Sequence, residues 1–120
     1  PTESVFMLIV YGIANCDTVK KTRKWLDAKG VEYSFHDYKK LGCDTKLAAE
    51  LIANIPLERL INTRGTTWRK LPDSEKDRLD ETSALALIQR ETSVIKRPIL
   101  RAGQAWVVGY DEAAFSALVN

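Results

Sequence analysis

The stretch FMLIVYGIANCDT, residues 6–18, decides the fold of this chain. Its first six residues form a continuous apolar run that ends at Gly12, a pattern typical of a strand buried on both faces of a sheet. Apolar residues then recur at helical spacing over about Asp17–Lys29, and Gly30 follows, which predicts an amphipathic helix with a glycine stop. Cys16 therefore lies between a central strand and the first turn of a helix.

Beyond this stretch, the sequence predicts further strands of the same sheet. Apolar and polar residues alternate over Val31–His36, which indicates a second strand with one wetter face. The order strand, helix, strand implies parallel pairing. Near the end of the chain, Ile99–Leu100 and Ala105–Val108 flank the turn residues Ala102–Gln104, a hairpin pattern, and Asp111 is placed to cap a last helix.

The middle of the chain, roughly residues 44–91, is predicted to be mainly helical. Asp44 is placed to cap a helix that Pro56 ends. The other expected pieces are a short helix at Leu57–Ile61, a polar loop at Asn62–Thr67, a turn from Pro72 and a helix at Ser83–Arg90. The whole chain, residues 1–120, is read as one α/β domain with a mixed sheet.

The composition is that of a folded protein with no strong general affinity for polyanions. Of the 120 residues, 45% are hydrophobic and 28% charged, with a formal net charge of +2, so we expect neither nucleic-acid nor membrane binding. No apolar stretch is long enough for a membrane span, and residues 5–11 lack the flanks of a secretory signal. A cytoplasmic monomer with reduced thiols is expected, and no function is assigned to Pro1–Ser4.

Cys16 is the strongest candidate for chemistry. At a helix start, free amides and the helix dipole favour a thiolate. The dipole contributes roughly 0.3–2 kcal/mol, which lowers a thiol pKa by only about one unit, so full activation needs a nearby cation. Asp17 would oppose activation if its carboxylate approached the sulfur. The alternative is a buried structural cysteine.

A partner thiol within the same motif is missing. Val19 stands where a Cys-x-x-Cys motif would have its second cysteine, so a resolving thiol must come from elsewhere. Cys43 is interpreted as a passive surface or helix-leading thiol rather than as that partner. Glutathione is the more natural resolving thiol.

Three groups of residues occur in order along the chain. They are Asn15-Cys16-Asp17-Thr18 with Lys20-Lys21 and Trp25-Leu26, Asn62-Thr63-Arg64-Gly65-Thr66-Thr67 with Arg69-Lys70-Leu71, and Ile95-Lys96-Arg97-Pro98-Ile99. Together they resemble the ArsC/Spx family, and most closely its YffB branch, over nearly the whole chain. The resemblance implies a thioredoxin-like mixed sheet with an inserted helical region, and a cis peptide bond before Pro98, beside the cysteine.

The resemblance also implies roles for individual residues. Arg97 would bring its guanidinium near Cys16 as the activating cation, and Arg64 would be a second anion contact, with Arg69 as a weaker substitute. Asn15 and Pro98 would line the substrate site. The alternative for each arginine is a solvated surface charge.

The implied activity is that of a glutathione-dependent thiol reductase or oxidoreductase with one nucleophilic cysteine. Glutathione or another small thiol is the expected co-substrate, and glutaredoxin is a further possible partner. A glutaredoxin-linked arsenate reductase is the first alternative, but the third arginine of such enzymes is absent from Val107–Asp111. An Spx-like regulator that binds RNA polymerase without catalysis is the second alternative, although Val19 replaces the second cysteine of such sensors.

Three other patterns in the sequence bear on function. No ligand cluster or phosphate-cradling loop is present in the sequence, so neither a bound cofactor nor a metal is expected. His36 lies on an alternating strand and is interpreted as a packed or edge histidine rather than a general base. The basic residues over Lys20–Lys24 either form a solvated helix face, which is the favoured reading, or draw an anionic thiol toward Cys16.

Overall fold

We describe residues 7–119 of the chain from a computed structural model. The chain forms two compact units. The first, here called the sheet unit, runs through Tyr38 and resumes at Arg97, and the second, the helical unit, is Lys39–Lys96. The predicted helical region of residues 44–91 falls within the second unit.

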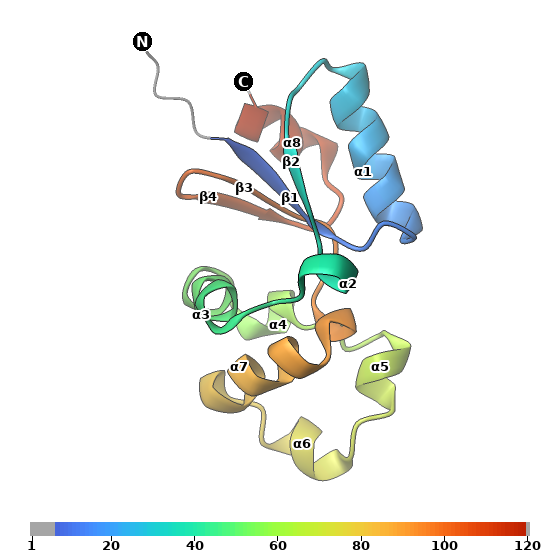
Figure 1. Cartoon of the computed structure of the whole chain (residues 1–120). Helices are drawn as coiled ribbons and strands as arrows, with labels where there is room; N and C mark the ends of the chain where they lie inside the picture. The colour runs from blue at the N-terminus through green and yellow to red at the C-terminus, as the bar shows by residue number, and fades with distance from the viewer. Residues whose placement is uncertain (1–6, 120) are drawn as a thin grey trace. The chain divides into compact units, whose positions relative to one another are not determined.

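The sheet unit contains one mixed four-stranded sheet (Figure 1). Its strands are β1 (Leu8–Gly12), β2 (Ser34–Asp37), β3 (Ile99–Ala102) and β4 (Ala105–Val108), in the order β2-β1-β3-β4. β1 pairs with β2 in parallel and with β3 antiparallel, so the predicted central strand and its parallel partner are both confirmed. β3 and β4 pair antiparallel as the predicted hairpin.

Helices α1 (Asp17–Ala28) and α8 (Glu112–Val119) cover one face of this sheet (Figure 1). The core between the sheet and these helices is formed by buried side chains from β1, β3, α1 and α8: Leu8, Val10, Leu26, Leu100 and Phe115. Full burial of a Leu or Phe side chain contributes about 1.5–3 kcal/mol each. The apolar positions of β1 therefore hold both helices against the sheet.

α1 begins and ends for reasons visible in the sequence. Thr22 is fully buried in its inner face, where the Thr22 hydroxyl donates to the Thr18 carbonyl at 2.8 Å, so the buried hydroxyl is satisfied. Gly30, at a φ of +68°, ends the helix, and the Val31 amide donates to the Leu26 carbonyl at 3.0 Å. This is a Schellman ending. Lys29, expected to lay its stem on the buried stripe, is instead exposed.

The helical unit is built around two longer helices, α3 (Thr45–Asn54) and α7 (Glu81–Arg90). Asp44 caps α3 as predicted, its carboxylate accepting from the Leu47 amide at 2.8 Å. Asp80 and Ser83 cap α7 reciprocally. The shorter pieces are α2 (Tyr38–Leu41, which starts at the end of the sheet unit), α4 (Leu57–Leu60), α5 (Thr66–Arg69), α6 (Asp73–Asp77) and the 3₁₀ turn η1 (Thr92–Val94).

Several boundaries differ from the sequence prediction; helices α1, α4 and α7 differ by one or two residues at one end. β2 begins only at Ser34, because Val31 belongs to the ending of α1 and its amide is used there. The expected loop Asn62–Thr67 is shorter, since Thr66 already starts α5 after the N-cap Gly65. Pro72 does not start a simple turn but precedes α6, where its fixed φ suits a helix start. Phe6, placed in the first strand, lies outside the described residues.

Across residues 7–119, no helix is both long and apolar enough to cross a bilayer. Within the same range, no three side chains of His, Cys, Asp or Glu come together in a way that could hold a metal ion.

Gly12 at the end of β1 has no room for a side chain. A Cβ there would lie 2.7 Å from Cγ2 of Val19, a fully buried and β-branched residue of α1. We expect Gly12→Ala to lower the free energy of unfolding by about 1–3 kcal/mol through overpacking, measured by urea denaturation. Val19→Ala added to it should recover part of this loss, and independent, additive effects of the two substitutions would contradict the contact.

Candidate active site

Cys16 stands between the end of β1 and the start of α1. The chain turns at Ala14 and Asn15, and the Cys16 amide donates to the Ile13 carbonyl at 3.1 Å. Cys16 is the N-cap of α1 and has extended backbone angles, while its carbonyl accepts from the Lys20 amide at 2.9 Å. The side chain is half-buried, so the sulfur is held by the helix start and still reaches solvent.

The surroundings of the sulfur lower the pKa of the Cys16 thiol below its ordinary value. Partial burial acts in the opposite direction and is the largest single influence, but four others together outweigh it. These are hydrogen bonds from the amides of Val19 and Thr18, a hydrogen bond from the Arg97 side chain, and the positive charge of Arg97. Amides of the first helical turn and one guanidinium thus stabilise the thiolate.

Arg97 reaches Cys16 from the segment that leads into β3. The Arg97–Pro98 peptide bond is cis, as the family resemblance implied. Pro98 is buried, and its carbonyl accepts from the Gly109 amide at 2.8 Å, which ties the loop after β4 to the start of β3. Arg97 itself is half-buried. Asn15 is exposed in the turn before the cysteine, and its part in substrate binding stays a prediction.

Asp17 does not counteract the activation in this arrangement. It is exposed at the first position of α1 and is absent from the influences on the Cys16 pKa. The Asp17 carboxylate therefore does not raise the pKa of the Cys16 thiol.

Cys43 differs from Cys16 in every respect that governs reactivity. It is buried in the helical unit, directly before the N-cap of α3, so its prediction as a helix-leading thiol holds and the surface alternative is wrong. Burial, with a smaller contribution from the Asp44 charge, raises the pKa of its thiol to about 11. At neutral pH this thiol stays protonated, and a protonated thiol is a poor nucleophile.

The remaining predicted residues are Arg64 and Arg69 in the helical unit and His36 in the sheet unit. Arg64 and Arg69 are exposed residues of the helical unit, and their roles as anion contacts stay predictions. The His36 ring packs between Tyr11 and Tyr38, with ring centroids 5.3 and 5.5 Å away. His36 is on an edge strand of the sheet, consistent with a packed edge histidine.

Sequence reasoning missed one contact next to the Pro98 segment. Nζ of Lys21 lies 4.4 Å from the centre of the Tyr110 ring, which joins α1 to the loop after β4. The Tyr110 hydroxyl donates to the Glu112 carboxylate, and this hydrogen bond raises the pKa of Tyr110 to about 12. Nothing in the local sequence pairs Lys21 with Tyr110, because the two residues meet only where α1 packs beside the loop after β4.

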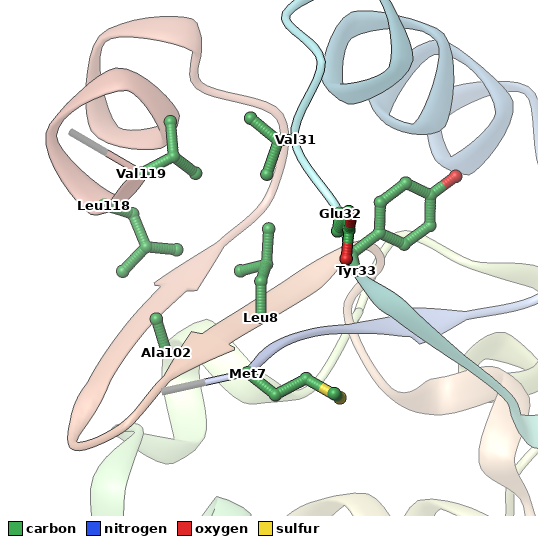
Figure 2. Close-up of a pocket in the computed structure, with 8 residues that line it drawn as sticks. All are labelled: Met7, Leu8, Val31, Glu32, Tyr33, Ala102, Leu118 and Val119. Atoms are coloured by element: carbon green, nitrogen blue, oxygen red, sulfur yellow. The ribbon is translucent and has the colours of Figure 1, made fainter. Parts of the chain in front are cut away.

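An apolar pocket of about 290 Å³ lies at the opposite end of β1 (Figure 2). Figure 2 shows Leu8 and Ala102 from the sheet, Val31 after α1, and Leu118 and Val119 from α8 around it. Cys16 and Arg97 do not line this pocket. The thiol site is instead defined by the backbone and Arg97.

The mixed sheet with its flanking helices is a thioredoxin-like α/β fold, and it presents a cysteine where the first strand meets the first helix. Residues 11–118 match the ArsC family model. The chain belongs to the ArsC family. A solved structure of a YffB protein is 40% identical, covers 95% of this chain and all of its own, and superposes with a TM-score of 0.90.

Two relatives of known sequence extend this comparison. An uncharacterized protein of Haemophilus influenzae is 39% identical, over 92% of this chain and 97% of the relative. The global transcriptional regulator Spx of Streptococcus mutans is 25% identical, over 94% of this chain and 83% of the relative. The predicted family and fold are thereby confirmed.

The two thiols should separate clearly by reactivity. We expect iodoacetamide at neutral pH to alkylate Cys16 and leave Cys43 unmodified, with Cys43 reacting only as the pH approaches its raised pKa of about 11. Peptide mapping by mass spectrometry after alkylation at a series of pH values measures both. Equal alkylation of the two cysteines in the folded protein at neutral pH would contradict the assignment, and unfolding in urea should abolish the difference.

Arg97 should set the acidity of Cys16. In Arg97→Ala the thiol loses a hydrogen bond and a positive charge, so the midpoint of its thiolate absorbance should move to higher pH than in the native protein. Arg97→Lys keeps the charge without the planar fork and should fall between the two. A Cys43→Ala background leaves one titrating thiol, and identical midpoints in all three proteins would remove Arg97 from the activation.

Proposed function

We propose that the protein is a glutathione-dependent thiol oxidoreductase that uses Cys16 as its single nucleophile. The observation that carries the proposal is the stabilised thiolate: the sulfur is half-buried, bonded by the amides of Thr18 and Val19, and paired with Arg97. Membership of the ArsC family, whose name refers to arsenate reductase, agrees with thiol chemistry. The raised pKa of the Cys43 thiol, about 11, argues against Cys43 as the resolving thiol.

The reaction proceeds by two thiol–disulfide exchanges. The Cys16 thiolate attacks the glutathionyl sulfur of a mixed disulfide, forms a new S–S bond to it, and displaces the other sulfur as a thiolate. A glutathione thiolate then attacks the glutathionyl sulfur held on Cys16. Glutathione disulfide leaves, and Cys16 is regenerated as a thiolate. The net reaction consumes one free glutathione and turns the mixed disulfide into the reduced substrate thiol and glutathione disulfide, so the number of disulfide bonds is unchanged and no bound cofactor is required.

Arg97 has two uses in this scheme. Its charge favours the ionised form of Cys16 before the attack, and it stabilises the same sulfur when Cys16 leaves as a thiolate in the second exchange. The cis Pro98 segment, fixed by the Gly109 amide, holds the guanidinium at this position. Asn15, exposed in the preceding turn, is free to contact the incoming peptide.

Turnover can be tested with a cysteine peptide that carries a glutathionyl disulfide. With free glutathione present, we expect the native protein to release the reduced peptide and glutathione disulfide. Glutathione reductase then reduces the glutathione disulfide, and the loss of NADPH absorbance measures the rate. Cys16→Ser should reduce the rate to that without protein, because the nucleophile is gone, whereas Cys43→Ala should keep it. Native protein that performs no better than Cys16→Ser would overturn the proposal.

Two other activities, arsenate reduction and RNA polymerase binding, can be tested with the same purified protein. Arsenate reduction with glutathione and glutaredoxin is expected to be weak, because Val107–Asp111 provides no arginine and each lost charge-assisted hydrogen bond costs about 1.5–3 kcal/mol. The likeness to a transcriptional regulator makes RNA polymerase binding the competing outcome. Capture of polymerase subunits without disulfide turnover would favour it.

A further inference from the structure

The basic residues of α1 are concentrated in its middle turns. Four of them fall between Lys20 and Lys24, against a single acid, Asp17, in the first turn, and the last turn of α1 holds no basic residue. The first of the four, Lys20, is the one nearest to Cys16 in the chain.

Two of these cations are engaged with aromatic rings. Lys21 lies over the Tyr110 ring. Arg23 donates to the Tyr33 hydroxyl at 3.2 Å and stacks on Phe35, with its guanidinium carbon 4.3 Å from the ring centre. Their positions are set by packing within the sheet unit.

The other two, Lys20 and Lys24, are exposed, and within residues 7–119 their ammonium groups form no ion pair. The Lys20 amide donates to the Cys16 carbonyl, so Lys20 lies one turn above Cys16 on the same side of the helix, and Lys24 lies one turn further. Helical side chains lean toward the N-terminal end. The direction rule therefore points the Lys20 side chain back toward the turn that holds the sulfur, while its charge is not among the influences on the Cys16 pKa, which leaves the ammonium for a ligand at the sulfur.

Resting on the proposed function, we propose that Lys20 is a specificity-determining residue that selects disulfides bearing carboxylates close to the sulfur. Lys24 contributes more weakly. When the Cys16 thiolate attacks such a disulfide, one sulfur becomes bonded to Cys16 and the other leaves as a thiolate. A carboxylate a few bonds from the attacked sulfur then lies beside the Lys20 ammonium. Neutral disulfides gain nothing from this charge, and cationic ones are repelled.

The inference is tested by the charge of the disulfide. Single-turnover rates of Cys16 mixed-disulfide formation are measured by quenching and intact mass, in a Cys43→Ala background, with glutathione disulfide (anionic), hydroxyethyl disulfide (neutral) and cystamine (cationic). We expect Lys20→Gln at low ionic strength to lower the anionic-to-neutral rate ratio about two- to tenfold. The cationic-to-neutral ratio should rise. High salt should shrink both changes.

The helix provides its own matched controls. Lys24→Gln and Lys29→Gln remove the same single charge at greater distances from Cys16, and lysine and glutamine have similar helix propensities, so the fold is preserved. The effect on the rate ratio should fall in the order Lys20, Lys24, Lys29. Because the neutral disulfide reports thiolate reactivity, the ratio is insensitive to a change in the Cys16 pKa.

The outcomes separate the two proposals. If hydroxyethyl disulfide reacts with every variant, and the anionic-to-neutral rate ratio is unchanged or changes equally at all three lysines, the role of Lys20 is overturned. The oxidoreductase proposal would remain intact. Failure of all three disulfides to modify Cys16 in the native protein would overturn both.

Discussion

The contact between the end of β1 and α1 is the constraint on which the rest of the site depends. Gly12 permits Val19 to pack directly on the strand, which brings the first turn of α1 against the sheet and leaves Cys16 as its N-cap. The amides of Thr18 and Val19 then point at the sulfur because of where the helix starts. If α1 packed less closely on β1, the helix could still form, but its first-turn amides would no longer be held in hydrogen-bonding position toward the sulfur.

Arg97 completes the site from a distant part of the sequence. The antiparallel pairing of β3 with β1 places Tyr11 opposite Ile99, so the residues just before Ile99 arrive at the end of β1 where Cys16 follows. The first turn of α1 lowers the pKa of the Cys16 thiol through hydrogen bonds from the amides of Val19 and Thr18. The guanidinium adds a hydrogen bond and a charge. Local and long-range structure thus act on one atom.

The sequence predicted those features that have a local cause. The buried run before Gly12, the stop at Gly30 and the cap at Asp44 each follow from one or two residues, and all three are found. Short helices are harder to predict from the sequence. Pro72 predicts a turn, whereas the structure has helix α6 there, because five residues provide too little periodicity to recognise a helix. The burial of Cys43 and the pairing of Lys21 with Tyr110 depend on packing between segments far apart in the chain. The proximity of Arg97 to Cys16 was implied only by family resemblance.

The protonated state of Cys43 shapes how the protein responds to oxidants. A disulfide between Cys16 and Cys43 would require the Cys43 thiol, with its raised pKa, to react against its preference for the protonated form. Beside the sulfenic acid that a thiolate can form, disulfides of Cys16 are therefore expected mainly with other molecules. Their proportions would then follow the surrounding pool of small thiols.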